Sequence, residues 1–378
     1  MNFAFCLFNY FPFGGLERDF MAISRECLRR GHAIQVYTMS WQGERPAGLS
    51  LHLVKSGGRT NHGRAALFQH HLAGELAAAS HDLVVGFNKM PGLDLYYAAD
   101  VCYRARIRRQ RTFLARLTPR YRLLAAFEEA VFAPDSSTDI IYLASQEKRH
   151  YQAVYHTPDA RFYYGPPGVD VAAIRAQLGP ETRRALRGEL GLSDQDLLLL
   201  MIGSHFHTKG VERAIRSLAA LPAEIRSRSF LYIIGRGKAG PYQKLAARLG
   251  VAGQVRFLGG RDDVPRFLGG ADILLQPSLT ENTGNAIVEA LVAGVPVLAT
   301  EACGYSEHVL AADSGRVVGS APFRQQEMDM ALAEMISSPW RRMWRENGLA
   351  YSEQHDMGSR PQVVADILEQ NARKRGRG

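Results

Sequence analysis

The sequence predicts an α/β protein built from two doubly wound, Rossmann-like domains. Three observations support this. The chain has 378 residues, about twice the usual length of a single domain. Short apolar runs alternate with helical stretches along most of it, as in parallel βαβ units. The alternation stops at GPPGVD, residues 165–170, where prolines and glycines cannot continue a helix or a central strand, and then begins again.

The first half opens with a strand at Phe3–Phe8, a glycine turn, a helix at Leu16–Arg30 ended by Gly31, and a strand at Ala33–Tyr37. We expect its further strands at Leu51–Val54, Leu83–Phe87, Leu95–Ala98 and Ile140–Ala144. In the second half we expect strands at Leu197–Ile202, Phe230–Ile234, Val255–Leu258, Ile273–Gln276 and Val295–Ala299, and helices at Val211–Ala220, Tyr242–Leu249 and Asn285–Val292.

These patterns divide the chain into an N-terminal domain, 1–167, and a C-terminal domain, 168–350. Residues 351–378 are expected to form a helix with a basic tail that packs back on the N-terminal domain. The composition is 46% hydrophobic and 22% charged, without a low-complexity tract, which indicates a globular chain.

Cysteines and apolar runs bear on the compartment. The four cysteines are scattered, so they suggest neither a disulfide framework nor a zinc pattern, and a reducing cytoplasm fits best; they are Cys6, Cys27, Cys102 and Cys303. The apolar start lacks a preceding Lys or Arg and is broken early by Pro12, so it is not a signal peptide. No run reaches the 18 or so apolar residues of a membrane helix.

The formal net charge of +9 points to an acidic partner. Nucleic acid, anionic lipid and a phosphorylated substrate all remain open on this ground.

One motif suggests a nicotinamide cofactor. Residues 235–240, GRGKAG, fit G-x-G-x-x-G, follow an expected strand and precede a helix. However, they follow the second strand of their domain, whereas the dinucleotide fingerprint belongs to the first βα turn. The competing interpretation is a tight turn beside the binding cleft.

A stronger constellation is ENTGNAIVE, residues 281–289, directly after an expected strand and running into a helix. Backbone amides near Asn282 to Asn285 can hold sugar hydroxyls or phosphate oxygens, helped by the helix dipole and by Gly284. Glu289 can accept hydrogen bonds from both ribose hydroxyls. A helical rise over eight residues would separate the two glutamates by about 12 Å, too far for the carboxyl pair of a glycosidase.

Here the chain resembles the retaining glycosyltransferases of the two-Rossmann (GT-B) architecture. In that family two glutamates separated by seven residues stand at the transition from this strand to the following helix. Residues 281–300 match that pattern, and so do GSHFHTKG (203–210), IIGRGKAGPYQKLAARLG (233–250), VRFLGGRDDV (255–264) and PPGVD (166–170). Longer segments resemble the lipopolysaccharide core glucosyltransferases, which add the first outer-core hexose to heptose: FNYFPFGGLERDFM (8–21), TNHGR (60–64), GFNKMPGLDLYYAADVCY (86–103) and CGYSEHV (303–309).

The resemblance implies two domains facing a central cleft, with Lys209 neutralising the leaving diphosphate and Glu281 beside the donor sugar. Thr208 stands where relatives often have Arg, which leaves the second cation of the phosphate clamp unassigned. The full expected donor site comprises Gly14, Gly15, Gly203, Lys209, Arg261, Glu281, Asn282, Thr283, Gly284, Asn285 and Glu289.

No metal or other cofactor is expected. His205 and His207 flank the same loop, but no carboxylate stands at ligand spacing from them.

On the acceptor side the resemblance assigns Asp100, at the end of a strand, as the base or orienter of the acceptor hydroxyl, with Asp19 as the second candidate. The role needs hydrogen-bond reach of that hydroxyl. Capping of the following segment is the alternative for Asp100.

A basic amphipathic stretch occupies residues 103–132. Apolar residues recur there at mainly helical spacing among eight arginines, which suits an anionic bilayer surface: Arg104, Arg106, Arg108, Arg109, Arg111, Arg116, Arg120 and Arg122. A buried helix with a solvated face and a nucleic-acid site are the alternatives.

The resulting hypothesis is transfer of a hexose, with retention, to a heptose of the lipopolysaccharide core on the cytoplasmic face of a bacterial inner membrane. The expected partners are a UDP-sugar, glucose foremost, the core acceptor and anionic lipid, without nucleic acid. Galactose or N-acetylhexosamine transfer, a nucleotide-sugar epimerase and a peripheral nucleic-acid-binding protein remain as alternatives.

Overall fold

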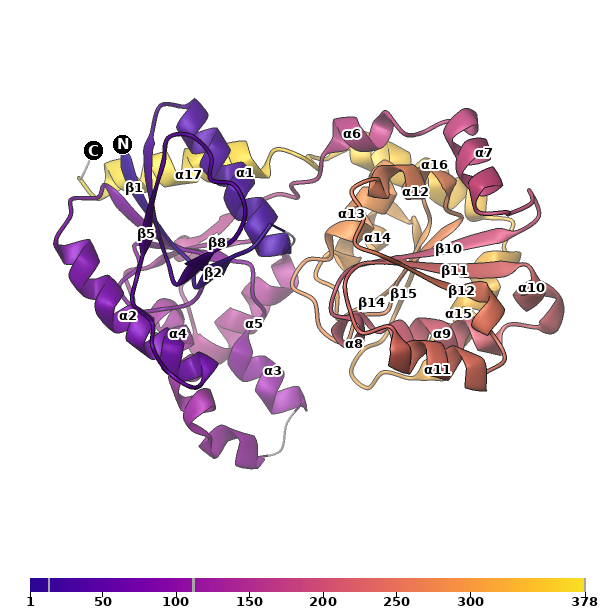
Figure 1. The fold of residues 1–378 in the computed structure, drawn as a ribbon, viewed down its shortest axis with the longest axis horizontal. Coiled ribbons are helices and arrows are strands. Elements are labelled where there is room, and N and C mark those ends of the chain that lie inside the picture. Colours follow the sequence, from indigo (N-terminus) through magenta and orange to yellow (C-terminus); the bar gives the residue numbers. More distant parts are fainter. Residues whose placement is uncertain (13, 111–112, 377–378) are drawn as a thin grey trace. The chain divides into compact units, whose positions relative to one another are not determined.

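The computed structural model describes residues 1–12, 14–110 and 113–376, with the backbone alone for 109, 110 and 113. The chain separates into two compact units (Figure 1). Unit 1 comprises residues 1–168 and 359–378, and unit 2 comprises 169–358. We expected the return to the first unit at residue 351, but the helix Arg341–Gln354 belongs to unit 2.

Unit 1 contains a seven-stranded sheet in the order β5-β3-β1-β6-β7-β8-β9, all parallel. Its strands are β1 (Asn2–Cys6), β2 (Asn9–Tyr10), β3 (Ala33–Thr38), β4 (Ser40–Trp41), β5 (Leu49–Leu53), β6 (Leu83–Gly86), β7 (Leu95–Ala98), β8 (Asp139–Tyr142) and β9 (Phe162–Tyr164), of which β2 and β4 form a separate pair. Its helices are α1 (Gly15–Arg29), α2 (Asn61–Ala77), α3 (Tyr103–Gln110), η1 (Phe113–Leu117), α4 (Pro119–Phe132), α5 (Ser145–Tyr155), η2 (Asp159–Arg161) and α17 (Arg360–Lys374).

Unit 2 contains a six-stranded parallel sheet in the order β12-β11-β10-β13-β14-β15. Its strands are β10 (Leu197–Ile202), β11 (Ser229–Ile234), β12 (Val255–Gly259), β13 (Ile273–Gln276), β14 (Val297–Thr300) and β15 (Gly315–Val318). Its helices are α6 (Val171–Arg175), α7 (Pro180–Glu189), α8 (Phe206–Lys209), α9 (Val211–Ala220), α10 (Ala223–Ser227), α11 (Gly240–Arg248), η3 (Ala252–Gln254), α12 (Val264–Gly270), α13 (Asn285–Val292), α14 (Ser306–Ala312), α15 (Gln325–Ser337) and α16 (Arg341–Gln354).

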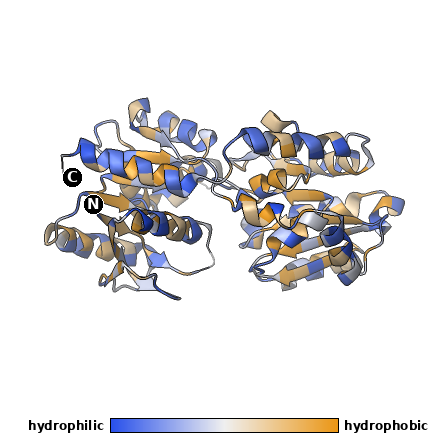
Figure 2. Ribbon diagram, turned by 90° about the horizontal axis from the view of Figure 1, so that it is seen from above, coloured by the Kyte–Doolittle hydropathy of each residue, from blue (hydrophilic) through white to orange (hydrophobic). Residues whose placement is uncertain are grey.

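Both sheets confirm the prediction of doubly wound domains. The strand order runs outward from the first strand, then reverses to the other side, between β1 and β6 in unit 1 and between β10 and β13 in unit 2. The central strands are buried on both faces, as their continuous apolar runs require; Leu197 to Met201 are all buried. Figure 2 shows hydrophobic strands inside each unit and helices with hydrophilic outer faces. In such folds ligands bind beyond the carboxyl ends of the strands at the reversal.

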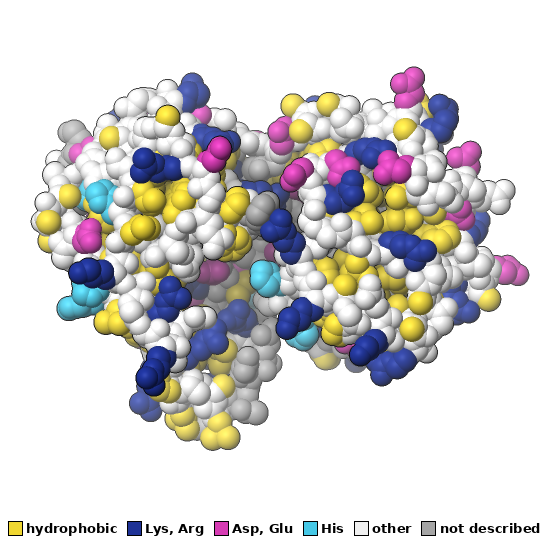
Figure 3. Space-filling view, in the orientation of Figure 1, with side chains coloured by type: hydrophobic (Ala, Val, Ile, Leu, Met, Phe, Trp, Pro, Cys, Tyr) yellow, Lys and Arg dark blue, Asp and Glu magenta, His cyan; other side chains and the backbone are white. Residues whose placement is uncertain are grey.

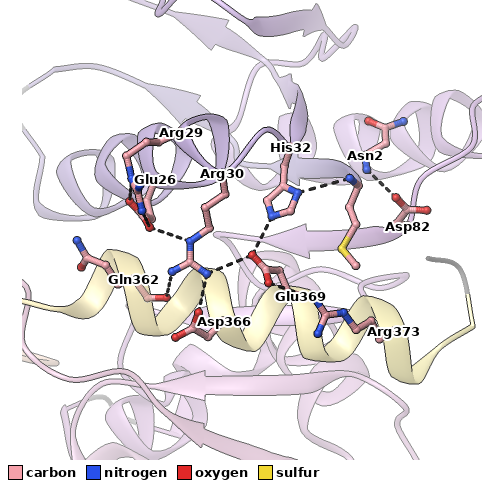
Figure 4. A network of polar contacts seen from close by, with 11 residues as sticks. Asn2, Glu26, Arg29, Arg30, His32, Asp82, Gln362, Asp366, Glu369 and Arg373 are labelled. Atoms are coloured by element: carbon pink, nitrogen blue, oxygen red, sulfur yellow. Dashed lines mark hydrogen bonds and ion pairs between the residues drawn. The ribbon is translucent and has the colours of Figure 1, made fainter.

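The C-terminal helix α17 is held on unit 1 by an apolar face and a set of ion pairs. Val364, Ala365 and Leu368 are buried in the same core as Phe3 and Phe5 of β1. Figure 4 shows the polar contacts: Arg30 reaches Asp366 at 2.5 Å and Glu369 at 3.1 Å, and His32 contacts Glu369 at 2.9 Å. α17 therefore packs against β1 and along α1 of unit 1.

Candidate active site

The reversal point of unit 2 brings together the two residues that we assigned to the leaving diphosphate and the donor sugar. Lys209 ends α8, in the turn after β10, and Glu281 follows β13, the neighbouring strand. The Lys209 ammonium donates a hydrogen bond to Glu281 Oε2 across this point. Their side chains are only 19% and 17% exposed, so solvent screens this pair weakly.

Glycines shape the backbone around Lys209. Gly203 has φ +147°, and a Cβ there would lie 2.6 Å from Lys209 Cε. Gly210 has φ +76°, and its Cβ would lie 2.0 Å from the carbonyl oxygen of Pro277. Only glycine lets the lysine stem and the following helix approach the neighbouring strands this closely.

Glu281 is fixed by backbone pairing with the segment after β14. Its amide donates to Ala302 O at 3.0 Å, and its carbonyl accepts from Gly304 N at 3.3 Å. Burial, followed by the nearby negative charge of Glu281, raises the pKa of the Cys303 thiol to about 11, so this cysteine stays protonated at neutral pH.

The start of α13 has the geometry expected for holding oxygen atoms. Gly284 adopts φ +96° as N-cap, a conformation that favours glycine. Asn282 is buried, and Thr283 accepts a backbone bond from Tyr305. Asn285 Oδ1 is buried without a hydrogen-bond partner among the described residues, so it can accept a hydrogen bond from a ligand hydroxyl.

Glu281 and Glu289 do not lie on one helix, contrary to our expectation. Glu281 precedes the helix, which begins at Asn285, so only Glu289 is helical. It is the fifth residue of α13, a little over one turn from the start. The rise of an α-helix therefore does not give the distance between the Glu281 and Glu289 carboxylates.

Arg261 is engaged within unit 2. Its guanidinium makes two bonds to Asp263, at 2.6 and 2.8 Å, and lies over the Phe267 ring. The bonds to Asp263 raise its pKa, so it stays charged. A UDP-sugar that contacted Arg261 would have to share its guanidinium with Asp263.

The segment GRGKAG has a structural explanation. A Cβ at Gly235 would lie 2.2 Å from Gly203 O, and one at Gly237 would lie 2.6 Å from the Phe206 ring. These glycines let the turn after β11 pack against the turn after β10. The motif lies one strand away from the reversal point, as the tight-turn interpretation requires.

In unit 1, carboxylates gather where the strands end. Asp100 follows β7 and is exposed, and Tyr151 donates to its backbone carbonyl at 2.7 Å. Glu17, in the first turn of α1, is buried, and burial, with the charges of Asp100 and Asp19, raises its pKa. Sequence reasoning did not select Glu17, although it stands in the GGLERD turn that we singled out.

Gly14 and Gly15 begin α1 as expected. Gly14 is the N-cap, and a Cβ there would lie 1.7 Å from Glu17 Oε2. The glycine therefore makes room for the Glu17 carboxylate, a role within unit 1.

Asp19 is occupied by two internal partners. Its Oδ2 accepts from Tyr97 OH at 2.8 Å and from Arg360 Nη1 at 2.7 Å. Arg360 is 1% exposed and also donates to Pro166 O. Because these two partners already occupy the Asp19 carboxylate, Asp100 is the better candidate for the acceptor hydroxyl. The pairing spans 341 residues, so no local pattern could reveal it.

The arginine segment is not one helix. It folds as α3, η1 and α4, with a new start at the N-cap Thr118 and Pro119. Figure 3 shows Lys and Arg side chains with apolar ones over this part of unit 1. Leu114 and Leu117 are 71% and 51% exposed. Arg111 and the Arg109 side chain lie outside the described residues.

The remaining arginines of the segment, which the structure describes, are half-buried or exposed, and none of them is fully buried. Arg104 is half-buried, bonded to Glu129 at 2.6 Å and lying over the Tyr155 ring. Arg106 and Arg116 are half-buried, and those with exposed side chains are Arg108, Arg120 and Arg122.

A buried carboxylate fixes this segment to the sheet. Glu128 of α4 is fully buried and accepts from Lys89 Nζ at 2.5 Å and from the backbone N–H groups of Tyr103 and Arg104. Burial raises the pKa of Glu128, but the Lys89 charge and these N–H donors outweigh it, so the net pKa is lowered. Lys89 also donates to Val101 O, which ties the Asp100 loop to α4.

Neither a metal cluster nor a membrane-spanning helix is found within the described part of the chain. No three His, Cys, Asp or Glu side chains there stand together as metal ligands. No helix among these residues has the length and apolarity to cross a bilayer.

In comparisons with known proteins, the chain is similar to glycosyltransferases. The family model "Glycosyl transferases group 1" matches residues 182–350. The lipopolysaccharide glucosyltransferase WaaG of Escherichia coli K12 is 42% identical over 369 residues, 97% of this chain and 98% of the relative. A D-inositol 3-phosphate glycosyltransferase of Streptomyces scabiei is 36% identical, over 43% of this chain and 37% of the relative.

Solved structures show the same similarity. The crystal structure of WaaG, a glycosyltransferase involved in lipopolysaccharide biosynthesis, superposes with a TM-score of 0.91 at 41% identity, covering 97% of this chain and 99% of that one. Anabaena HepE in complex with UDP-glucose superposes with a TM-score of 0.72 at 19% identity, covering 98% and 100%, a likeness of fold alone.

Two Rossmann-like units, the family match and the superposition on a solved glycosyltransferase define the chain as a glycosyltransferase of the GT-B fold. Its similarity to WaaG extends over nearly the full length of both chains. The chain therefore belongs to the family of the lipopolysaccharide glucosyltransferase WaaG, within the group 1 glycosyl transferases.

Proposed function

We propose that this glycosyltransferase transfers glucose from UDP-glucose to a heptose of the lipopolysaccharide core, with retention of anomeric configuration. The observation that supports this best is the Lys209–Glu281 pair at the reversal point of unit 2, in a chain 42% identical to a lipopolysaccharide glucosyltransferase. The Lys209 cation stabilises negative charge as the sugar–phosphate bond breaks. Glu281 orients the hexose.

The other proposed donor contacts surround that pair. Backbone amides at the start of α13 donate to hydroxyl or phosphate oxygens, Asn285 Oδ1 accepts from a hydroxyl group, and Glu289 binds the ribose. In unit 1, Asp100 orients the acceptor hydroxyl or accepts its proton, while Asp19, which pairs with Arg360, has a structural role in this proposal. No metal takes part in this proposal, because charge on the diphosphate is met by Lys209, amides and the helix dipole.

The test is a screen of UDP-sugars by thermal shift and by UDP release, with and without truncated lipopolysaccharide. We expect UDP-glucose to stabilise the protein and to turn over with the acceptor. A preference for UDP-galactose or for a UDP-N-acetylhexosamine would mean that the donor sugar is not glucose. Conversion of the donor without acceptor would indicate an epimerase and would contradict transfer.

We propose further that residues 103–132 attach the protein to an anionic membrane surface on the cytoplasmic side. Exposed Leu114 and Leu117 stand beside exposed arginines, the combination that inserts shallowly into a charged interface. Each arginine near such a surface contributes about 1 kcal/mol. The two acids of the segment are already neutralised, Glu128 by Lys89 and Glu129 by Arg104.

Vesicle co-sedimentation tests this attachment. The variant carries Gln at Arg106, Arg108, Arg116 and Arg122. Its matched control carries Gln at four exposed arginines of unit 1 outside the segment: Arg25, Arg45, Arg59 and Arg149. We expect the variant alone to lose binding to anionic vesicles and 1 M salt to have the same effect on the wild type, since screening there shortens to about 3 Å. Equal binding by variant and control would refute attachment.

A further inference from the structure

Unit 1 contains a pocket of about 250 Å³, close to the lower end of the roughly 300–1,000 Å³ usual for ligand sites. It lies beyond the carboxyl ends of β1 and β3, since Phe8 and Asn9 follow β1 and Met39 follows β3. The remaining wall comes from the start of α2 and the start of α4. The lining residues are Phe8, Asn9, Met39, Asn61, His62, Arg64, Ala65, Arg120 and Leu124.

Two guanidinium groups give this pocket its charge. Arg64 lies in the first turn of α2 and Arg120 in the first turn of α4. Neither helix has an acidic residue in that turn. Within residues 1–12, 14–110 and 113–376, no ion pair joins either guanidinium to a carboxylate. An anion entering the pocket would therefore meet two cations that have no internal counter-charge.

The local backbone holds these groups in place. Thr60 caps α2 by accepting from Gly63 N at 3.1 Å, and Arg64 N donates to Thr60 O at 2.9 Å. Gly58 adopts φ +133°, and a Cβ there would lie 3.4 Å from Arg64 N. The motif TNHGR thus forms a capped helix start whose positive dipole end adds to the cationic charge.

The other walls suit a sugar rather than a bare ion. Asn9 and Asn61 offer amides that can bond hydroxyl groups. Phe8, Met39, Ala65 and Leu124 form an apolar side, and the Phe8 ring is fixed edge-on against Phe68 at 5.7 Å. Apolar surface with a few convergent polar groups is the usual composition of a small-molecule site.

The distance between this pocket and Asp100 indicates which sugar of the acceptor the pocket binds. Asp100 follows β7, and β7 is two strands from β1 along the same sheet edge, about 10 Å at the usual strand spacing. That separation spans about two sugar rings of one oligosaccharide, so a substituent on a sugar one or two residues from the accepting one can reach the pocket.

We propose that this pocket binds an anionic substituent, a phosphate or a carboxylate, on a sugar of the acceptor one or two residues from the accepting one. Arg64 and Arg120 make charge-assisted hydrogen bonds to the anion, and the amides and the apolar side hold the ring. This inference rests on the proposed function, since it names what the acceptor must carry. Because Arg120 belongs to the arginine segment, that segment would contact the acceptor as well as the membrane.

The test measures oligosaccharide binding by calorimetry without donor. The probes are a deacylated lipopolysaccharide core oligosaccharide and its neutral twin, with phosphates removed and carboxyl groups reduced. The variant is Arg64→Gln/Arg120→Gln. Its control is Arg45→Gln/Arg59→Gln, which makes the same charge change on exposed arginines of unit 1 outside the pocket.

We expect the variant to bind the anionic oligosaccharide about 100-fold more weakly than the wild type, roughly tenfold for each guanidinium, with the control unchanged. Toward the neutral twin, wild type and variant should be alike. Equal affinity of variant and wild type for the anionic probe would overturn the proposal, and so would a wild type that binds both probes equally.

A lipid headgroup is the other source of the same chemistry, and Arg64→Gln separates the two because Arg64 is outside the arginine segment. We expect it to weaken oligosaccharide binding about tenfold and to leave sedimentation with anionic vesicles unchanged. Loss of vesicle binding with intact oligosaccharide affinity would overturn the proposal in favour of a headgroup site. Arginine-dependent oligosaccharide binding without any sugar transfer would keep this pocket and contradict the proposed function instead.

Discussion

Lys209→Ala removes the cation at the centre of the proposed chemistry. In the free protein its ammonium is bonded to Glu281, and both side chains are mostly buried. The substitution therefore also leaves the Glu281 carboxylate without its counter-charge. Because Lys209 ends the short helix α8 with its stem against Gly203, alanine should be accommodated without rearranging the strands.

The expected loss follows from the charge on the leaving diphosphate. Two unit charges about 4 Å apart interact by about 4 kcal/mol at an effective dielectric constant of about 20, and removing one preorganised donor in other enzymes costs about 2.7–4 kcal/mol. The turnover number should thus fall by about 100- to 1,000-fold. UDP affinity should fall only about tenfold, since much of the charge develops as the bond breaks.

Initial rates of acceptor-dependent UDP release, with UDP calorimetry alongside, measure both quantities. Lys244→Ala, which removes an exposed lysine of α11, should behave as the wild type. Adding Glu281→Gln to Lys209→Ala should recover part of the UDP affinity, because the unpaired carboxylate repels the diphosphate. A turnover number within about threefold of the wild type, or a loss confined to UDP affinity, would refute this role of Lys209.

Five further substitutions test individual assignments. Glu289→Ala should weaken UDP binding roughly 100-fold, about 3 kcal/mol; unchanged affinity by calorimetry in a folded variant would remove the ribose contact. Asp100→Asn should lower acceptor-dependent transfer about 100-fold at unchanged UDP affinity, whereas Asp19→Asn should lower the melting temperature; the reverse pattern would exchange their roles. Glu128→Gln should cost about 3–5 kcal/mol at pH 7 by denaturant unfolding. Because the folded-state pKa of Glu128 lies below 4.5, the wild-type advantage should be complete above pH 4.5 and shrink as the pH falls through the folded-state pKa; an advantage independent of pH would contradict this. The pKa of Glu17 is raised, so its ionised form costs stability, and Glu17→Gln should raise the melting temperature at pH 8 but not at pH 4; a lower melting temperature at pH 8 would contradict it.

Local patterns predicted the secondary structure of the site well. The strands Leu197–Ile202 and Ile273–Gln276 and the helices Val211–Ala220 and Asn285–Val292 have the predicted bounds. In each case a compact apolar run is bounded by glycine or a polar turn, so boundaries depend on residues nearby. Since β10 and β13 are adjacent, the turns that follow them bring Lys209 and Glu281 together.

Contacts between distant segments were beyond local reasoning. The partner of Asp19 is Arg360, and that of Glu128 is Lys89, 39 residues away. Periodicity also suggested one basic amphipathic stretch over residues 103–132, where the structure has α3, η1 and α4. The break there agrees with Thr118 and Pro119, a cap and a first-turn proline, a local signal that the count of arginines obscured.

The proposed reaction is transfer of glucose to a heptose with retention of anomeric configuration. The structure of the product tests it most directly. Wild-type protein is incubated with UDP-glucose and lipopolysaccharide truncated after the inner-core heptoses, and the isolated saccharide is analysed by NMR. We predict one added glucose in α linkage to heptose, the configuration that it has in the donor. A β linkage, or UDP release without any glucose attached to the saccharide, would contradict this account.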